Sequence, residues 1–172
     1  MLVAMSRAFV KNDNGEQPGD ELPERPQSPH PNYVTPGGLA ALQAQLGDLQ
    51  EHRRRLVEEP ENLLNKETLK LVERDLRYVQ GRLDHAIPVD PATQPADQVS
   101  FGAVVKTVDE NGVERDFAIV GEDEADAAAG KVSWVSPLAR ALMGAGVGDS
   151  VTWKRPAGDL QLEILSIRYP HA

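Results

Sequence analysis

The side chains of this chain that could do chemistry are mostly carboxylates, and four of them cluster at Glu122, Asp123, Glu124 and Asp126. Carboxylate oxygens are the ligands that hard divalent cations prefer, so a metal loop is one interpretation. The cluster lacks the alternating ligands and the terminal glutamate of an EF-hand loop, however. The pattern therefore favours a solvated loop, or a loop that contacts basic groups on a partner.

The residues needed for most other site chemistry are missing or scattered. The chain has no cysteine, which excludes disulfides, thiolate zinc sites and cysteine nucleophiles. The histidines are too dispersed for a zinc site or a serine-histidine-aspartate triad. No glycine-rich phosphate loop follows a predicted strand. We therefore expect no catalytic residue, no metal and no cofactor; the four histidines are His30, His52, His85 and His171.

The only basic cluster is the run 52–55, with the sequence HRRR. Such a cluster could contact RNA or the acidic walls of a partner. It could equally be a solvated helix face whose arginines pair with Glu51, Glu58 and Glu59 at three- and four-residue spacing. The residue types leave both interpretations open.

A more distinctive segment covers residues 133–149, with the sequence SWVSPLARALMGAGVGD. Ser136 can cap a short helix that has Pro137 at its first position. A stripe of three apolar residues with i, i+3, i+4 spacing begins at Leu138 and indicates a core-facing side. The residues left exposed for a partner are Ser136, Pro137 and Arg140.

Two tryptophans need separate interpretations. Tryptophan is enriched in binding hot spots, but in a domain with few aromatic residues it also fills the core. Trp134 lies inside the Ser-Pro segment, so we assign it in part to an interface. We assign Trp153, in a later predicted strand, to the core.

Two heptad patterns predict the helices that precede this segment. Thr35 can cap the first helix, with Pro36 at the first position, where a missing N–H costs nothing. Two helices joined by a short link around Pro60, with no third amphipathic helix, form an antiparallel coiled-coil hairpin. Both series have 3-4-3-4-3 spacing: Leu39, Leu42, Leu46, Leu49, Arg53 and Leu56, then Leu69, Val72, Leu76, Val79, Leu83 and Ala86.

The segments on either side of the hairpin have a different composition. Residues 1–33 are rich in proline and polar residues, which predicts a disordered arm in which only Ala8-Phe9-Val10 and Tyr33-Val34 could dock. The hairpin covers residues 34–88. Prolines stiffen a linker over residues 89–97.

From residue 98 the pattern changes to strand-like alternation. Strands are predicted at 99–108, 116–120, 131–134, 151–154 and 160–167, with a bulge at Gly102 and a helix at 137–143. An Asn-Gly pair predicts a hairpin turn at 109–112. Residues 98–170 therefore form a small mixed sheet with one short helix, and the whole chain belongs to the α+β class.

Composition limits the class of partner. The chain has 172 residues, a net charge of −9 and an isoelectric point of about 4.9. A protein that binds DNA on its own is usually basic, so autonomous DNA binding is not expected. No apolar run approaches the roughly 18 residues of a membrane span, and no signal peptide is evident, so we expect a cytoplasmic protein.

Three segments resemble the GreA/GreB family of bacterial transcription elongation factors. Residues 33–39 are similar to the start of the family's first coiled-coil helix. Residues 119–126 are similar to its strand and acidic loop, and residues 133–149 to its C-terminal signature. The resemblance covers residues 33–169 and implies a coiled-coil hairpin followed by an FKBP-like domain.

The resemblance also implies a partner and a mode of action. The C-terminal domain of these factors docks on a coiled coil of the largest RNA polymerase subunit, at the rim of the secondary channel, and the hairpin enters the channel. The implied polymerase contacts are Ser136, Pro137, Leu138, Arg140, Ala141 and Trp134. The resemblance also allows an indirect contact with nascent RNA.

The chain departs from the family at the hairpin tip. Cleavage-competent members carry an acidic motif there that helps to hold Mg²⁺ in the polymerase active centre, and no such motif is present in this chain. Each arm is also one heptad shorter, which retracts the tip by roughly 10 Å. The tip residues are Arg54, Arg55, Glu58, Glu59 and Glu61. We interpret the glutamates as solvated turn charges that favour the start of the second helix, in preference to replacement Mg²⁺ ligands.

The sequence thus predicts a non-enzymatic, polymerase-binding factor that lacks cleavage stimulation, similar to short-hairpin relatives such as Rnk but with an N-terminal extension. A peptidyl-prolyl isomerase is one alternative, because the implied domain is FKBP-like. A coiled-coil adaptor for another protein is the other.

Overall fold

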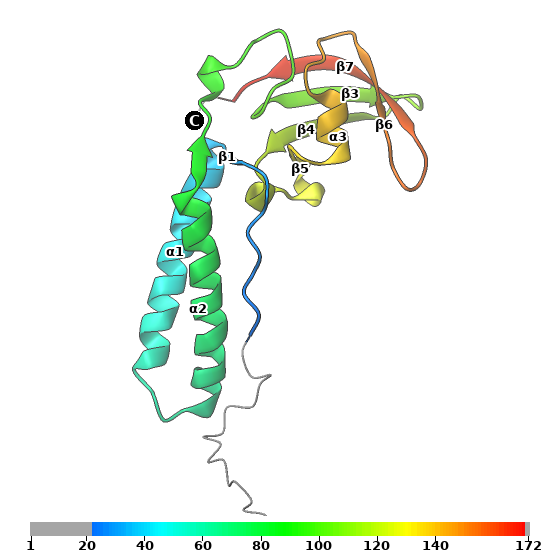
Figure 1. The fold of residues 1–172 in the computed structure, drawn as a ribbon. Helices are drawn as coiled ribbons and strands as arrows, with labels where there is room; N and C mark the ends of the chain where they lie inside the picture. Colours follow the sequence, from blue (N-terminus) through cyan, green and yellow to red (C-terminus); the bar gives the residue numbers. More distant parts are fainter. Residues whose placement is uncertain (1–21, 171–172) are drawn as a thin grey trace, which may run out of the picture.

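The computed structural model describes residues 22–170. In it a long helical hairpin stands beside a curled sheet that carries one short helix (Figure 1). The α+β class and the order of the two parts agree with the sequence prediction.

The hairpin consists of α1, Pro36–Val57, and α2, Leu63–Asp84, each 22 residues long. As predicted, Thr35 caps α1: its hydroxyl accepts a hydrogen bond from the amide of Gly38 at 2.9 Å. Asn62 caps α2 in the same way, and Pro60 lies in the link between the helices. Two arms of equal length reach about 33 Å from the base, at 1.5 Å per residue.

The heptad seam holds the two helices together. Leu42, Val72 and Val79 are buried along it, and flanking leucines pack against them. Arg53, the one polar residue predicted for the seam, is exposed and pairs across the hairpin with Glu73 at 3.2 Å. The seam is therefore apolar near the base and closed by an ion pair towards the tip.

The base of the hairpin differs from the prediction. Ala86 does not continue the helix; it begins β2, Ala86–Pro88, which pairs in parallel with β1, Asn32–Val34. The residue before a proline favours extended backbone, which accounts for the early helix end before Pro88. Residues 22–34, predicted as disordered up to residue 33, instead run along α2 and into this small sheet (Figure 1). Ala8-Phe9-Val10 lie outside the described residues.

The C-terminal sheet has the strand order β5-β4-β3-β7-β6. Only β5 and β4 pair in parallel, and the other neighbours are antiparallel. A short turn, η1, Pro91–Thr93, precedes the sheet. The strands are β3, Val104–Asp109; β4, Glu114–Val120; β5, Lys131–Ser133; β6, Ser150–Trp153; and β7, Leu160–Arg168.

The main core lies between this sheet and α3, Pro137–Leu142. Leu138, Ala139 and Leu142 of α3 are almost fully buried. They pack on the face of the sheet that carries Val105, Phe117, Ile119, Leu162 and Ile164. The core is largely aliphatic, as the low aromatic content requires.

The start of the first long strand also differs from the prediction. Residues 99–103 are not part of the strand: the amide of Ala103 donates to the carbonyl of Ser100 to close a turn, in which Gly102 adopts a φ of +87° that only glycine takes up readily. Val99 and Phe101 are still buried, so the alternation that suggested a strand reflects burial within a turn. The irregular pairing lies instead between β3 and β7, next to Lys106 and Thr107.

Within residues 22–170, no helix combines the length and the apolar character needed to cross a bilayer.

Candidate functional site

The N-terminus of α3 is built as the Ser-Pro segment predicts. The hydroxyl of Ser136 accepts a hydrogen bond from the amide of Ala139 at 3.2 Å, and Pro137 takes the first helical position. The carbonyl of Ser136 also accepts from the amide of Arg140 at 3.0 Å. These bonds fix which side of the short helix turns outward.

The predicted contact residues fall into two groups. Pro137 and Arg140 are exposed, and Ser136 and Ala141 are partly exposed, so these four are open to a partner. Leu138 is only 3 % exposed because it packs in the core, so its predicted contact role does not fit the structure.

Trp134 is partly buried and lies at the junction with the N-terminal segment and the base of the hairpin. Its ring packs edge-on against Tyr33, with centroids 5.1 Å apart, and against His30 at 6.0 Å. Its indole nitrogen is buried and has no hydrogen-bond partner among the described residues. Trp153, assigned to the core from the sequence, is only partly buried: its ring packs edge-on against Phe117 at 6.1 Å and also lines a groove beside α3.

A groove of about 820 Å³ opens beside α3. Ser136 and Pro137 form one wall, and the short turn η3, Ala127–Ala129, forms another. Phe117 and Trp153 supply apolar surface, and the charged residues of the lining are two basic ones, Lys131 and Arg115, and one acidic one, Asp116. The groove can therefore accept an apolar side chain or helix that is flanked by acidic residues.

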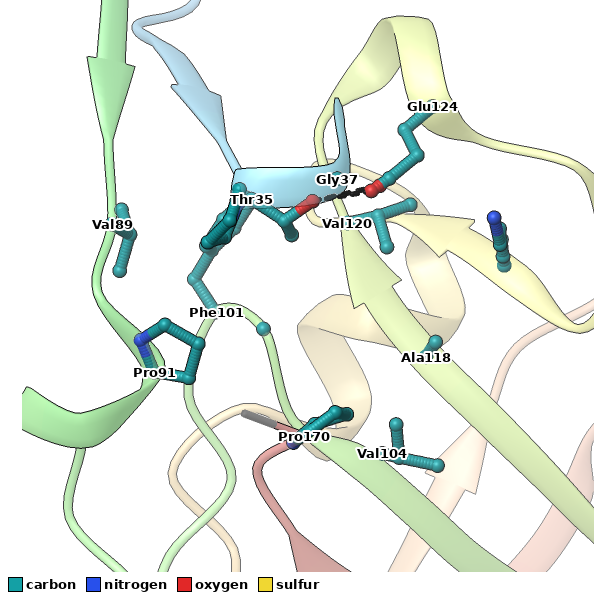
Figure 2. A pocket seen from close by; sticks show the side chains of 13 residues that line it. Thr35, Gly37, Val89, Pro91, Phe101, Val104, Ala118, Val120, Glu124 and Pro170 are labelled. Carbon is teal, nitrogen blue, oxygen red and sulfur yellow. Dashed lines mark hydrogen bonds between the residues drawn. The ribbon is translucent and has the colours of Figure 1, made fainter. Parts of the chain in front are cut away.

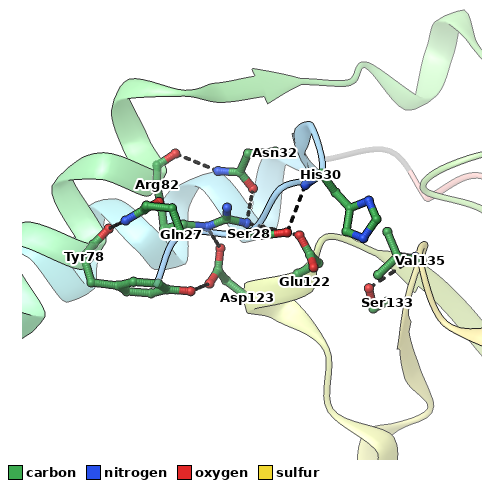
Figure 3. Close-up of polar contacts among 10 residues, drawn as sticks. All are labelled: Gln27, Ser28, His30, Asn32, Tyr78, Arg82, Glu122, Asp123, Ser133 and Val135. Carbon is green, nitrogen blue, oxygen red and sulfur yellow. Dashed lines mark hydrogen bonds and ion pairs between the residues drawn. The ribbon is translucent and has the colours of Figure 1, made fainter. Parts of the chain in front are cut away.

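Three of the four carboxylates in the acidic loop bind α2 or the cap of α1 and are not simply solvated as the sequence predicted, whereas Asp126 is exposed. The loop forms η2, Glu122–Glu124. Arg82 of α2 is 3 % exposed, and its Nε donates to Asp123 at 2.6 Å (Figure 3). A second nitrogen of Arg82 lies 3.7 Å from Glu122. The hydroxyl of Tyr78 also donates to Asp123, at 2.6 Å.

Asn32 completes this network, which we call the joint: Asn32, Tyr78, Arg82, Glu122 and Asp123. Arg82 donates to the side-chain oxygen of Asn32 at 2.7 Å, and the Asn32 amide donates to the Arg82 carbonyl at 2.6 Å. Burial, together with the hydrogen bond to Asp123, raises the pKa of Tyr78. The joint ties three segments that are far apart in sequence.

A second contact between hairpin and sheet involves the cap of α1. The hydroxyl of Thr35 donates to the carboxylate of Glu124 (Figure 2), while it accepts from the amide of Gly38. A pocket of about 320 Å³ lies beside it, lined largely by apolar residues such as Phe101, Val104 and Val120. The base of the hairpin is therefore bonded to the sheet domain by polar side chains, and an open apolar pocket lies next to these bonds.

Comparison with known proteins identifies the family. The family model "Transcription elongation factor, GreA/GreB, C-term" matches residues 94–169. The chain is 38 % identical to transcription elongation factor GreB of Neisseria meningitidis serogroup B over 153 residues, covering 80 % of this chain and 94 % of that protein. It is 37 % identical to transcription elongation factor GreA of a Methylobacterium species, covering 87 % and 89 %. The chain belongs to the GreA/GreB family of transcription elongation factors.

Solved structures of GreA/GreB factors are also similar to this chain. The GreA factor homolog 1 (Gfh1) of Thermus thermophilus is 23 % identical, with a TM-score of 0.38, covering 81 % of this chain and 99 % of that one. A GreA/GreB factor from Nitrosomonas europaea is 22 % identical, with a TM-score of 0.40, covering 80 % and 99 %. The FKBP-like character of the sheet domain stays a prediction.

The hairpin tip of this GreA/GreB factor is a set of exposed ion pairs. Arg54 pairs with Glu58 and with Glu51, and Arg55 also pairs with Glu51. Hydrogen bonds from Arg54 and Arg55 hold the pKa of Glu51 at about 2. Glu59 accepts a bond of 3.4 Å from the Asn65 amide. Among residues 22–170 no group of three or more acidic or histidine side chains is placed to hold a metal ion.

The sequence prediction missed the joint of this GreA/GreB factor. One signal was available, because Tyr78 and Arg82 belong to a second row along α2 that the heptad seam does not include. That row is Leu64, Thr68, Leu71, Asp75, Tyr78 and Arg82, with 4-3-4-3-4 spacing.

Proposed function

We propose that this chain binds RNA polymerase at the rim of the secondary channel and regulates elongation without stimulating transcript cleavage. The observation that carries the proposal is the open groove beside α3, which Pro137 lines, together with the exposed side chain of Arg140 one turn further along α3, in a chain of the GreA/GreB family. In this proposal the chain is a binding factor with no reaction or cofactor of its own, and it acts in the cytoplasm.

The chemistry of the groove supports a helical partner. Phe117, Trp153 and the alanines of η3 give an apolar floor, and Lys131 and Arg115 provide positive charge at the edge. An exposed coiled coil of the polymerase with acidic flanks fits such a surface. Arg140, one turn along α3, would add a further charge-assisted contact.

The joint supports a fixed hairpin direction. Once the sheet domain is docked, a hairpin that is held by buried polar bonds at its base points one way. We infer that it points into the channel, as in the wider family. Its ion-paired tip would occupy space there without supplying carboxylates to a metal.

Binding can be tested with the double variant Pro137→Ala, Arg140→Glu and purified core polymerase. We expect the Kd to rise by about tenfold or more, because an apolar contact is lost and a charge is reversed. The matched control is Lys106→Glu, which reverses an exposed charge on β3 away from α3. Unchanged binding by the double variant, or no binding by the unaltered chain, would contradict the proposed docking face.

A variant that fills the groove tests whether polymerase binding depends on the groove or on other parts of the surface. Ala128 is exposed and lines the groove, so Ala128→Trp should block a helical partner while leaving the core intact. Circular dichroism checks that the fold is retained. If Ala128→Trp binds polymerase normally, the partner does not enter the groove.

The absence of cleavage stimulation is tested on stalled elongation complexes that contain backtracked RNA. We expect no shortened RNA when this protein is added, and slower cleavage when it competes with an active cleavage factor. Shortened RNA that disappears after Glu58, Glu59 and Glu61 are changed to alanine would show that the tip does supply ligands.

The GreB and GreA relatives reported above are named as transcription elongation factors, and neither is named as an isomerase or an adaptor. The two alternatives therefore gain no support from the comparisons.

A further inference from the structure

The second row of α2, Leu64, Thr68, Leu71, Asp75, Tyr78 and Arg82, forms a continuous face of the helix. Its spacing keeps all six positions within a narrow sector, because 3.6 residues complete one turn. The heptad seam at Leu69, Val72, Leu76, Val79 and Leu83 lies about 100° away around the helix. This second face is thus separate from the contact with α1.

The half of this face near the base is covered by residues 24–32 of the same chain. Arg25 pairs with Asp75 at 3.2 Å, and its guanidinium lies 3.8 Å from the centroid of the Tyr78 ring. The Gln27 amide donates to the Tyr78 carbonyl at 3.1 Å. Asn32 bonds to Arg82, one turn further towards the base. Going back towards residue 22, the segment descends beside α2 towards the tip (Figure 1), and Glu24 pairs at 2.6 Å with Arg77, which lies on a neighbouring side of the helix and not on this face.

The half of the face near the tip has no cover among the described residues and is apolar. Leu64 is 78 % exposed and Leu71 is 42 % exposed. Thr68 is partly exposed between them, and its hydroxyl donates to the Leu64 carbonyl at 2.9 Å, so this donor is already used within the helix. An exposed apolar strip that continues a covered one indicates a binding surface.

The rest of the N-terminal segment has the length and the residues to cover this strip. Twenty-one residues precede Leu22 in the sequence. From Asp75 to Leu64 the helix rises only about 16 Å, which about five extended residues can span. Phe9 is the only aromatic residue in this segment, between Ala8 and Val10. Arg7 and Lys11 flank it, and the acidic link around Glu58–Glu61 lies at this end of the hairpin.

We propose that Ala8-Phe9-Val10 bind the exposed strip Leu64–Thr68–Leu71 of the same chain, so that the N-terminal segment lines α2 from the base to the tip. The proposal does not depend on polymerase binding. It predicts that the free protein presents a tip covered by its own N-terminus, with Arg7 and Lys11 beside the acidic link.

Single thiols give a direct test, because the natural chain has no cysteine. Leu64→Cys and Leu63→Cys are made in the full chain, and the rates of thiol alkylation are compared. Leu63 is 75 % exposed in the described structure and belongs to a different side of α2, so it is the matched control. We expect alkylation at position 64 to be about tenfold slower than at position 63, since thiol reactivity follows exposure.

A double substitution tests whether Phe9 and Val10 are the residues that cover Leu64. Phe9→Ser with Val10→Ser, added to the Leu64→Cys chain, should restore fast alkylation at position 64 and leave position 63 unchanged. Equal rates at both positions in the natural background would overturn the proposal. Protection that survives the Phe9 and Val10 changes, or that rises with protein concentration, would also overturn it, the latter by indicating a second copy as the cover.

Discussion

At the base of the hairpin the side chain of Arg82 is 3 % exposed and its Nε lies 2.6 Å from Asp123, whereas at the tip the side chain of Arg54 is 57 % exposed and lies 2.8 Å from Glu51. The two ion pairs have similar distances, but Arg82 is shielded from water and Arg54 is not. Exposed ion pairs contribute little because water and salt screen them. When a buried ion pair loses one partner, water cannot take its place, so breaking the contact between Arg82 and Asp123 costs more free energy.

The two regions also differ in what their bonds connect. The tip arginines Arg54 and Arg55 bond to residues three or four positions away in the same helix. The joint connects Arg82 to Asp123, 41 positions away, and to Asn32, 50 positions away. The bonds of Arg54 and Arg55 therefore stay within one helix and its end, while the joint bonds set the position of the hairpin against the sheet.

Among the variants that compare base and tip, Arg82→Met should cause the largest loss of stability. Methionine keeps much of the length but removes every donor, leaving Asp123 and Asn32 with unpaired groups. Loss of one partner from a buried pair costs about 3–5 kcal/mol, and the partial exposure of Asp123 reduces this to about 2–3 kcal/mol. Urea unfolding followed by circular dichroism measures the change in the free energy of unfolding.

Arg54→Met is the matched control for this experiment, because it makes the same substitution at the tip. Its urea midpoint should equal that of the natural chain. Similar losses from Arg82→Met and Arg54→Met would mean that burial does not distinguish the base from the tip.

The next effect is expected at Gly121, just before the acidic loop. A Cβ atom added at Gly121 would lie 2.4 Å from the Tyr33 carbonyl oxygen, which is backbone and cannot move aside easily. Gly121→Ala should therefore push β1 away from the loop and cost about 1–3 kcal/mol, the usual range for overpacking. Urea unfolding checks the loss, and widening of the distance between spin labels on α1 and on the sheet checks its cause.

Gly47 provides the opposite case within α1. No atom lies within 4 Å of a Cβ added there, and its backbone is helical. Gly47→Ala should stabilise the protein by about 0.5–1 kcal/mol, because alanine loses less backbone entropy in a helix. A destabilising Gly47→Ala would point to a contact on this side of α1 that the helix alone does not require.

Features that depend on contacts between residues close in sequence were predicted from the sequence, whereas features that depend on contacts between distant residues were not. The bounds of α1 were predictable because Thr35, Pro36 and the heptad spacing act within a few residues. The joint was not, because charge alone does not tell whether Asp123 faces water or an arginine 41 positions away. Asn32 looked like part of a disordered arm for the same reason, since its partner lies on α2, whereas Tyr33 was predicted to be able to dock and does pack against Trp134.

The candidate docking face was predictable in part. Helical periodicity correctly left Pro137 and Arg140 exposed, since α3 has one buried side. The same periodicity placed Leu138 on that buried side, and only the family resemblance had suggested it as a contact. Trp134 could not be assigned from sequence, because its neighbours Tyr33 and His30 come from the N-terminal segment.

Removing the N-terminal caps of the two helices should give stability losses that differ by only a small amount. Asn62→Ala removes only the cap of α2 at the tip and should cost about 1 kcal/mol. Thr35→Ala removes the cap of α1 and also the bond to Glu124, so it should cost about 1–2 kcal/mol. Urea unfolding of both variants gives the difference. A larger loss for Asn62→Ala than for Thr35→Ala would contradict the view that the base carries more stability than the tip.

The smallest effect on stability should come from Arg54→Ala, yet it should change the titration of Glu51 clearly. Bonds from Arg54 and then Arg55 lower the pKa of Glu51 from 4.5 to about 2, so removing Arg54 should raise that pKa part of the way back. Because the folded pKa is the lower one, any stability from these bonds is present above pH 4.5 and disappears as the pH falls towards 2. Carboxyl chemical shifts followed by NMR across this range measure the pKa, and the urea midpoint at neutral pH should not move. An unchanged pKa in Arg54→Ala would mean that the tip pairs do not persist in solution, whereas a lowered urea midpoint would give the tip a structural role that its exposure argues against.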